Sequence, residues 1–195
     1  MEENSSRLDY FLPENTMLDG RYHVLRVLGM GGFGITYEAV NEKVNRHVAV
    51  KEFFDRNIMA RQGVEIVVAD KNENENFREA KAKFLKEARR LGDFSAEPGI
   101  VHVLDYFEAN NTAYIVMEYV DGISLSRYLE QRGKVQPEAM FRLLMPLMET
   151  LDKVHKNGVI HRDISPDNIK LVKSENGKTS VKLLDFGSAR SYMDN

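Results

Sequence analysis

Three glycines near the start of the chain limit what it can fold into. Gly29, Gly31 and Gly34 have the spacing G-x-G-x-x-G, and glycines let a backbone approach phosphate oxygens and direct N–H groups at them. In a dinucleotide-binding turn, a helix follows the last glycine directly. Residues 35–40 instead read Ile-Thr-Tyr-Glu-Ala-Val, which is a strand pattern. The sequence therefore predicts a glycine loop between two antiparallel strands, although a plain flexible hairpin has the same spacing.

The rest of the chain changes from strand-rich to helical near Asp121-Gly122. An amphipathic helix is expected over residues 76–92, because apolar residues recur there every three or four positions. A longer helix over 137–158 starts with proline and ends with glycine, and Pro146 should kink it. Residues 55–75 show no clear pattern, except that 66–68 could form a strand and 71–76 is a solvated polar run. Further strands are expected at residues 22–28, 47–54, 66–68, 101–108, 113–119, 169–172 and 181–184.

A lysine and a glutamate stand out against their apolar surroundings. Lys51 ends the strand pattern Val-Ala-Val-Lys, and by itself it would be interpreted as a lysine that extends its stem from a strand end. Glu87 lies between Phe84 and Leu91 on the apolar face of the 76–92 helix. A carboxylate that faces a core is costly unless a cation pairs with it. We therefore expect Glu87 to pair with Lys51.

The most specific motif is His161-Arg162-Asp163-Ile164-Ser165-Pro166-Asp167-Asn168, between the second helix and a short strand. Asp163 is suited to accept a hydroxyl proton, and the amide oxygen of Asn168 is suited to Mg²⁺. Asp185-Phe186-Gly187 follows at a strand end and offers another oxygen ligand. Each motif alone is compatible with an ordinary turn, whereas both together in this order are not.

Composition excludes several classes of protein. The chain has no cysteine, which excludes disulfides and thiolate metal sites. A net charge of -3 and the lack of Lys or Arg runs give no support for binding nucleic acid or an anionic membrane. No apolar stretch is long enough for a membrane segment, and the start lacks the order of a signal peptide. We therefore expect a cytoplasmic protein.

Together these motifs resemble the protein kinase family, and GGFGITY, VAVKEFF and HRDISPDN are similar to bacterial serine/threonine kinases in particular. The resemblance covers about residues 21–190. It implies an α+β, two-lobed protein-kinase-like fold. Its expected parts are an N-terminal lead-in at 1–20, a β-rich N-lobe with one main helix at 21–117, a hinge at 118–122 and a partial helical C-lobe at 123–195.

The resemblance also implies an ATP- and Mg²⁺-dependent kinase that transfers phosphate to Ser or Thr of protein substrates. Lys51, held by Glu87, would grip the α and β phosphates, and Asp163 would orient the attacking hydroxyl. Asn168 and Asp185 would hold Mg²⁺. The residues expected to contact the nucleotide are Leu28, Gly29, Met30, Gly31, Gly32, Phe33, Gly34, Thr36, Ala49, Lys51, Met117, Glu118, Val120 and Lys170.

Within this family pattern, Met117 would be the gatekeeper, and the backbone of residues 118–120 would hold adenine. His161 and Phe186 would stack with Leu91 in a hydrophobic spine. These roles come from the family resemblance and not from spacing.

The sequence departs from the family pattern at several positions. Ser165 stands where a lysine usually touches the transferring phosphate, so transfer is expected to be slower or to use another cation. Lys170 replaces an aliphatic residue under adenine, and its methylene stem can still cover the base while the ammonium reaches water. Thr36 replaces the usual valine and retains one methyl.

The chain stops at Asn195, before any activation segment or later helices. We therefore expect a truncated kinase domain, whose 137–158 helix exposes an apolar face that invites self-association. Two other readings stay open: a nucleotide-binding but inactive, pseudokinase-like scaffold, and a small-molecule kinase. The H-R-D triplet and the three-glycine loop argue against the small-molecule kinase.

Overall fold

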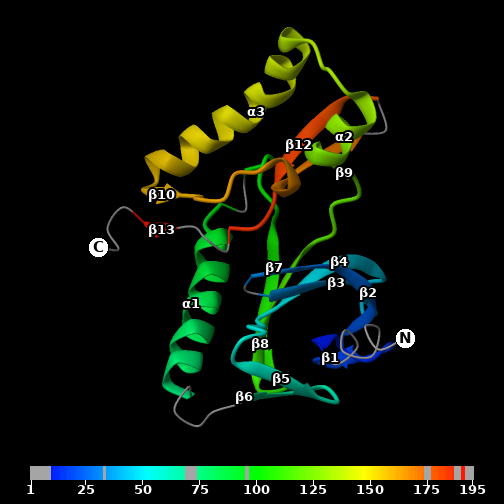
Figure 1. Cartoon of the computed structure of the whole chain (residues 1–195), viewed down its shortest axis with the longest axis vertical. Coiled ribbons are helices and arrows are strands. Elements are labelled where there is room, and N and C mark those ends of the chain that lie inside the picture. The colour runs from blue at the N-terminus through cyan, green and yellow to red at the C-terminus, as the bar shows by residue number, and fades with distance from the viewer. Residues whose placement is uncertain are drawn as a thin grey trace. The chain divides into compact units, whose positions relative to one another are not determined.

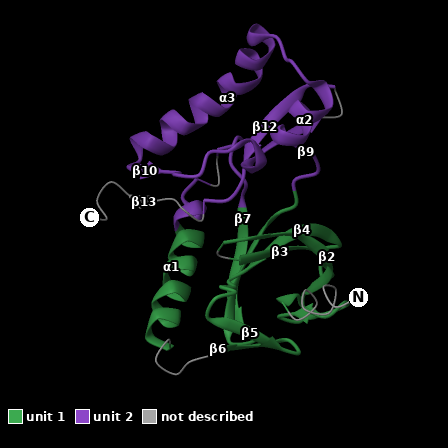
Figure 2. Ribbon diagram, in the orientation of Figure 1, with its two compact units in different colours: residues 1–89, 103–119 green, residues 90–102, 120–195 purple. Residues whose placement is uncertain are grey.

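The computed structural model describes residues 10–32, 34–68, 74–94, 97–173, 177–186 and 190–191 (Figure 1). The chain divides into two compact units, coloured separately in Figure 2. Unit 1 comprises Met1–Arg89 and Val103–Tyr119, and unit 2 comprises Arg90–His102 and Val120–Asn195. The division after Tyr119 falls within the residues expected to form a hinge.

Unit 1 is built on a six-stranded antiparallel sheet with the order β1-β2-β3-β4-β8-β7. Its first three long strands follow one another along the chain, and β8 then pairs with β4, so β4 is a central strand. The predicted strands in this region are confirmed. They are β1 (Met17–Leu18), β2 (Tyr22–Gly31), β3 (Gly34–Asn41), β4 (Arg46–Glu52), β7 (Val103–Ala109) and β8 (Thr112–Glu118), of which β1 is new.

A second, two-stranded sheet in unit 1 lies in the region that the sequence left unassigned. It is a hairpin of β5 (Met59–Gln62) and β6 (Glu65–Val68), with Gln62 opposite Glu65. Gly63 in the turn has a φ of 64°, a conformation that glycine adopts without steric cost. The sequence predicts only the strand at 66–68. The preceding Met-Ala-Arg-Gln lacks β-branched residues, so it gave no strand signal.

The described part of the N-terminal lead-in packs against unit 1. Leu12 is buried, and its backbone N–H donates to the Tyr37 hydroxyl at 3.1 Å. The Tyr10 ring meets the Phe54 ring edge-on, with centroids 5.7 Å apart. Residues 10–12 therefore belong to the folded core of this unit, although their sequence shows no regular pattern.

Helix α1 (Asn74–Gly92) confirms the helix expected at 76–92. Its buried side chains follow the expected three-and-four spacing and include Phe77, Phe84, Ala88 and Leu91. Phe53, two residues after Lys51, contacts this face, with ring centroids 5.8 Å from Phe77 and 5.5 Å from Phe84. The end of β4 is thereby packed against the apolar face of α1.

Unit 2 contains the helices α2 (Leu125–Arg132) and α3 (Pro137–Lys156). Ser124 caps α2 by accepting a hydrogen bond from Arg127 N–H at 3.2 Å. The remaining elements are two small sheets, with the orders β12-β11-β9 and β10-β13, and a short 3-10 helix. They are β9 (Ile123–Ser124), β10 (Val159–Ile160), η3 (Pro166–Asn168), β11 (Ile169–Lys173), β12 (Thr179–Leu183) and β13 (Arg190–Ser191).

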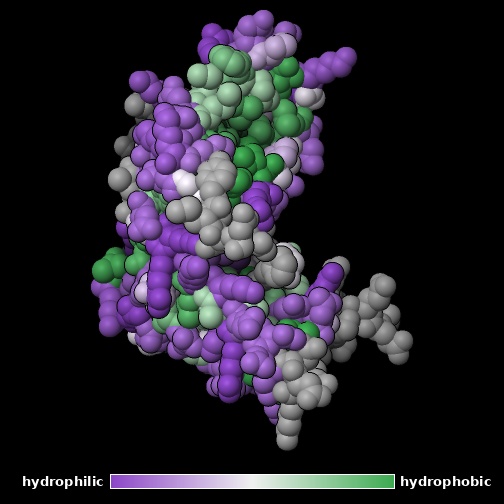
Figure 3. Space-filling model, turned by 90° about the vertical axis from the view of Figure 1, so that its left-hand side faces the viewer, coloured by the Kyte–Doolittle hydropathy of each residue, from purple (hydrophilic) through white to green (hydrophobic). Residues whose placement is uncertain are grey.

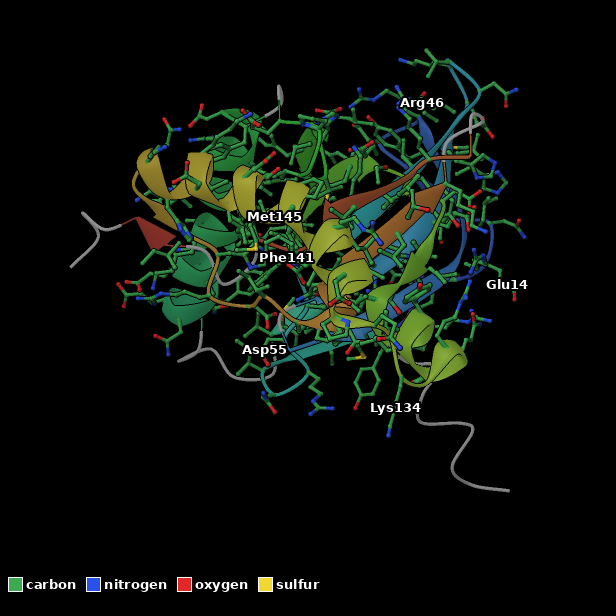
Figure 4. The ribbon with its side chains drawn as sticks, turned by 90° about the horizontal axis from the view of Figure 1, so that it is seen from above. Glu14, Arg46, Asp55, Lys134, Phe141 and Met145 are labelled. Carbon is green, nitrogen blue, oxygen red and sulfur yellow. The ribbon has the colours of Figure 1, made fainter. Side chains whose placement is uncertain are left out.

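Helix α3 confirms the longer predicted helix and continues through Pro146. Leu147, Thr150 and Val154 form its buried face. Two apolar residues of this helix, Phe141 and Met148, are 59% and 54% exposed, which agrees with the exposed apolar face expected from the sequence. Phe141 and Met145 project from the same side of the helix (Figure 4). Figure 3 shows hydrophobic residues gathered on the surface of the part of the molecule that contains α3.

No helix in the described part of the chain combines the length and apolar character that crossing a bilayer requires.

Candidate active site

The glycine loop joins β2 to β3, as the sequence predicts, and its glycines have different surroundings. A Cβ atom on Gly34 would lie 2.5 Å from the carbonyl oxygen of Glu52. A Cβ on Gly29, Gly31 or Gly32 would meet no described atom within 4 Å. The packing of β3 against β4 therefore requires glycine at position 34. Among the described residues, no neighbour prevents a side chain at positions 29, 31 and 32. Phe33, also expected to contact nucleotide, lies outside the described residues.

This difference predicts that two alanine substitutions have unequal effects on stability. Gly34→Ala should lower the free energy of unfolding by about 1–3 kcal/mol, because the new methyl group meets backbone that cannot move aside freely. Gly31→Ala should change it by less than about 0.5 kcal/mol. Urea denaturation of both variants measures the difference. Equal stability of the two would contradict the close packing of β3 against Glu52.

Strand pairing gathers expected nucleotide contacts on one face of the main sheet. Thr36 lies opposite Lys51, and Ala49 lies opposite Met117. Directly opposed residues share a face, and so do residues two apart on one strand. Thr36, Ala49, Lys51 and Met117 therefore project from the same side of β3, β4 and β8. The sequence identified these four residues, but only the register shows that they share a face.

Other residues expected near the nucleotide belong to β2, to the end of β8 and to the start of the second segment of unit 2. Leu28 and Met30 are 39% and 37% exposed on β2. Met117 is buried, and Glu118 ends β8. Val120 is the first residue of the second segment of unit 2. Exposed apolar side chains beside an open glycine loop are suited to contact a flat, apolar ring.

Lys51 is a buried cation, only 9% exposed. Glu87 is half-buried on α1, three residues after Phe84, which contacts Phe53. These contacts hold the helix face that carries Glu87 against the end of the strand that carries Lys51. The ion pair between Lys51 and Glu87 remains a prediction.

A charged cluster that the sequence analysis missed lies on the same face as Ala49. Glu38 is 6% exposed and lies opposite Ala49. Its Oε1 lies 2.8 Å from Nδ1 of His47, and its Oε2 pairs with Arg26. A glutamate inside a strand pattern gives no local sign of burial, so only the cross-strand partners reveal this cluster.

In unit 2, hydrogen bonds fix the loop that carries Asp163. Asn168 Nδ2 donates to the carbonyl oxygen of Asp163 at 2.9 Å and to its Oδ2 at 3.0 Å. The backbone N–H of Asp163 donates to His161 Nδ1 at 3.2 Å, so Nδ1 is the unprotonated nitrogen. His161 Nε2 therefore carries the proton and donates to the Leu184 carbonyl at 3.1 Å. The fully buried His161 thus connects the loop to the segment before Asp185.

Asp185 and Asn168 lie at the same end of paired strands. Ile169 lies opposite Leu183, and the N–H of Leu184 donates to the Asn168 carbonyl at 2.8 Å. Asp185 follows directly, with a φ of 48°. Phe186 packs against His161, with ring centroids 4.3 Å apart and planes at 65°. Gly187 lies outside the described residues.

Two of these residues have left-handed backbone conformations. Arg162 has a φ of 67°, and among the described non-glycine residues with positive φ it alone is neither Asn nor Asp. Such conformations cost on the order of 1–3 kcal/mol and cluster at functional sites. Arg162 precedes Asp163, and the other residue is Asp185 itself, so the strain occurs in both candidate catalytic segments.

The side chains at this strand end fit a magnesium ion. Asn168 uses its Nδ2 on Asp163, which leaves its Oδ1 available as a neutral ligand. Asp185 supplies a carboxylate. The described residues contain no group of three or more His, Cys, Asp or Glu placed to hold a metal. A pair of oxygen ligands suits Mg²⁺, which usually keeps waters and binds substrate phosphates as well.

Lys170 differs from the arrangement expected from the sequence. Its Nζ donates to the carbonyl oxygen of Gly122 at 2.9 Å. The ammonium is therefore held at the backbone directly before β9, whereas we expected it to extend into water. Its side chain is half-buried on β11, opposite Ser124.

A second buried network, also missed by the sequence analysis, lies on the opposite face of the unit 1 sheet. Glu52 is fully buried, and the Arg61 side chain is 2% exposed. Glu52 Oε2 accepts hydrogen bonds from Arg61 at 2.5 Å and from the Tyr37 hydroxyl at 3.0 Å, and Oε1 accepts one from the Tyr114 hydroxyl at 2.8 Å. The pKa of the Glu52 carboxyl is raised, because the effect of burial exceeds the opposing effects of Arg61 and the two hydroxyls.

Tyrosines in unit 1 make its stability sensitive to alkaline pH. Burial and the Asp105 carboxylate, 2.9 Å away, raise the pKa of Tyr22 to about 12. Burial and the nearby Glu52 also raise the pKa values of Tyr37 and Tyr114. An unfolded tyrosine has a pKa of about 10. The folded state therefore holds these protons more tightly, and this contribution is complete below pH ~10 and lost at higher pH.

We expect the melting temperature to fall steeply between about pH 10 and pH 12, as Tyr22 ionises more readily in the unfolded chain. Thermal unfolding across this range, followed together with tyrosinate absorbance, measures the effect. Tyr22→Phe should make the decline shallower. An identical decline in that variant would show that Tyr22 does not contribute.

Comparison with known proteins agrees with this geometry. Residues 22–195 match the protein kinase domain family. The serine/threonine-protein kinase pkn2 of Myxococcus xanthus is 35% identical over 178 residues, which are 91% of this chain and 19% of that protein. Serine/threonine-protein kinase PknD of Mycobacterium tuberculosis is 34% identical over 175 residues, 90% of this chain and 23% of that protein. A solved structure described as "PpkA-294 apo form" matches with a TM-score of 0.80 and 33% identity, covering 92% of this chain and 62% of that one.

The chain belongs to the protein kinase domain family. The expected α+β, kinase-like fold is thereby confirmed. Its named relatives are serine/threonine-protein kinases, and the chain spans about a fifth of the length of pkn2 and PknD.

Proposed function

We propose that this chain carries the ATP-binding and phosphoryl-transfer residues of a protein kinase that phosphorylates serine or threonine side chains of proteins. The observation that carries the proposal is the loop in which Asn168 donates to both the carbonyl and the carboxylate of Asp163. That arrangement fixes the Asp163 carboxylate, the group that would accept the proton of the attacking hydroxyl. The names of the relatives support serine and threonine as acceptors.

The proposed roles of the remaining residues follow from charge and position. Mg²⁺, held by Asn168 and Asp185, supplies positive charge that neutralises the phosphates during transfer. Lys51, oriented by Glu87, binds the α and β phosphates. Residues 28–34 cover the phosphates, with Gly29, Gly31 and Gly32 providing space for them. The nucleotide ring contacts Thr36, Ala49, Met117 and the backbone of residues 118–120, together with the stem of Lys170.

Two positions modify this proposal. Ser165 offers a hydroxyl where the family pattern has a lysine, so it can donate a hydrogen bond but cannot neutralise charge. We propose slower phosphoryl transfer than in a kinase with that lysine. Lys170 is held at Gly122, so its stem has a fixed direction in which to cover a base. A cytoplasmic location, and self-association through the exposed residues of α3, are also parts of this proposal.

Isothermal titration calorimetry of the chain with ATP, with and without Mg²⁺, tests nucleotide binding. We expect binding that requires Mg²⁺ and weakens in both Lys51→Ala and Gly31→Ala. The Gly31 variant is informative because its fold should be as stable as the wild type. Absence of binding by the folded wild-type chain would overturn the proposal.

A phosphotransfer assay then separates the remaining possibilities. Radiolabelled ATP is offered with a mixed Ser/Thr peptide library or with an aminoglycoside as the acceptor. Label in the peptides supports a protein kinase, and label in the aminoglycoside supports a small-molecule kinase. Nucleotide binding without transfer to either acceptor indicates an inactive scaffold.

A further inference from the structure

The buried carboxylate of Glu52 has an unusual position relative to the candidate active site. Glu52 directly follows Lys51 on β4. Adjacent residues on a strand point to opposite faces, so Glu52 lies beneath the sheet while Lys51 projects from the face expected to bind nucleotide. Any restraint on the Glu52 side chain therefore also restrains the backbone from which Lys51 projects.

Glu52 is connected to both strands that flank β4. The Tyr37 hydroxyl donates to it from β3, and the Tyr114 hydroxyl donates from β8. Thr36, next to Tyr37 on β3, lies opposite Lys51 on one side. Ile115, next to Tyr114 on β8, lies opposite Lys51 on the other side. The carboxylate thus joins three strands at the positions that surround Lys51.

The donors to Glu52 are themselves held in place. The Tyr37 hydroxyl accepts from the N–H of Leu12, and the Tyr114 hydroxyl accepts from Asn110 Nδ2 at 3.0 Å. Arg61 also donates to two carbonyl oxygens, those of Tyr10 at 2.9 Å and Val64 at 3.1 Å. The lead-in, the β5–β6 hairpin and the turn between β7 and β8 therefore orient the groups that bind this carboxylate.

A gain in stability is a weak explanation for the presence of the buried ion pair between Glu52 and Arg61. Replacing a buried ion pair with apolar residues of similar volume is often neutral or stabilising, because the charges need not be desolvated. What the ionised carboxylate adds is geometry: it accepts three hydrogen bonds from three directions at once. A glutamine in its place has only one acceptor oxygen.

We propose that Glu52 is a positioning residue for Lys51, and that the β5–β6 hairpin supplies the counter-charge for Glu52 through Arg61. This inference rests on the proposed function, in which Lys51 binds phosphates. Glu52 does not touch the nucleotide; it holds β3, β4 and β8 in the register that directs Lys51 toward the phosphates.

The test uses the double variant Glu52→Gln/Arg61→Gln, which removes both charges together and so leaves neither one buried alone. Its thermal stability is measured first, to establish that it folds. Leu18→Ala serves as the matched control, because it weakens the core of unit 1 at β1, away from the three connected strands. Affinity for Mg²⁺-ATP is then compared by calorimetry in the wild type and both variants.

We expect the double variant to fold but to bind Mg²⁺-ATP about tenfold to a hundredfold more weakly, because the loss of one hydrogen bond to a charged group has an effect of that size. Leu18→Ala should lower thermal stability and retain wild-type affinity. If the double variant binds Mg²⁺-ATP as tightly as the wild type, or if affinity in both variants simply follows stability, the pair has only a structural role and the proposal is wrong.

A second readout is independent of nucleotide binding. The rate at which an amine-reactive ester labels Lys51, and hydrogen exchange of the β4 amides, are measured by peptide mass spectrometry. Both should rise in the double variant and stay unchanged at β4 in Leu18→Ala. If the wild type does not bind ATP but these rates change as expected, the proposed function fails while the positioning role stands. Unchanged rates in the double variant would overturn the positioning role.

Discussion

Replacing Asp163 with asparagine is expected to lower kcat by about 10²–10⁴-fold, the usual contribution of a positioned general base. Asparagine has nearly the same shape, and the hydrogen bond from Asn168 to the backbone carbonyl at position 163 does not involve the side chain. The loop should therefore keep its conformation while losing the group that accepts a proton. Affinity for Mg²⁺-ATP should change little, because Asp163 is not among the proposed nucleotide or metal ligands.

Steady-state kinetics with a peptide acceptor, together with calorimetric ATP titration, measure both quantities. Asp167→Asn is the matched control: it lies in the same loop, and its Oδ1 accepts a hydrogen bond from Ser126, which asparagine can still accept. We expect that control to retain most of its kcat. A wild-type kcat in Asp163→Asn would show that Asp163 is not the general base.

Replacing Arg61 with methionine is expected to lower the free energy of unfolding by about 3–5 kcal/mol. The substitution leaves the fully buried Glu52 without its counter-charge. It also removes the donors that satisfy the carbonyl oxygens of Tyr10 and Val64.

Urea denaturation followed by two spectroscopic probes measures this loss. Lys83→Met is the control, because its ion pair with Glu79 is exposed and spans 3.9 Å, so its loss should cost less than about 1 kcal/mol. A deficit in Arg61→Met no larger than in this control would show that Arg61 does not neutralise Glu52.

The loss in free energy of unfolding caused by Arg61→Met should also depend on pH. Burial raises the pKa of Glu52, and removal of Arg61 removes an opposing influence. A carboxyl whose pKa is higher in the folded state stabilises that state only when protonated. This contribution is complete below the unfolded value of about 4.3 and is lost as pH rises through the folded pKa. The variant should therefore approach wild-type stability as the pH is lowered toward 4.3.

Much of the candidate site could be predicted because its residues occur in contiguous motifs. Asp163 and Asn168 lie within one eight-residue loop, and Asp185 follows one strand pair later. The glycine loop and Lys51 belong to strands that are consecutive along the chain. Local pattern was sufficient for these assignments, since the alternation of a strand and the spacing of a helix are properties of neighbouring residues.

Backbone conformation at the site was not predictable in the same way. The left-handed conformation of Arg162 runs against the intrinsic preference of an arginine, and aspartate, although it tolerates this region at Asp185, occurs mostly outside it. Both conformations persist because contacts around them, including those of the buried His161 with Leu184 and Phe186, fix the chain on both sides.

The sequence by itself determined which residues are available for chemistry and which segments form the main helices and strands. Only the tertiary structure decided that Glu52 meets Arg61, Tyr37 and Tyr114, which lie 9, 15 and 62 positions away along the chain. Periodicity carries no information at such separations, because strand register and hairpin docking, rather than local preference, bring these groups together. A glutamate beside Lys51 gives no sign of burial in the sequence; its partners become visible only when β3, β4, β8 and the β5–β6 hairpin assemble.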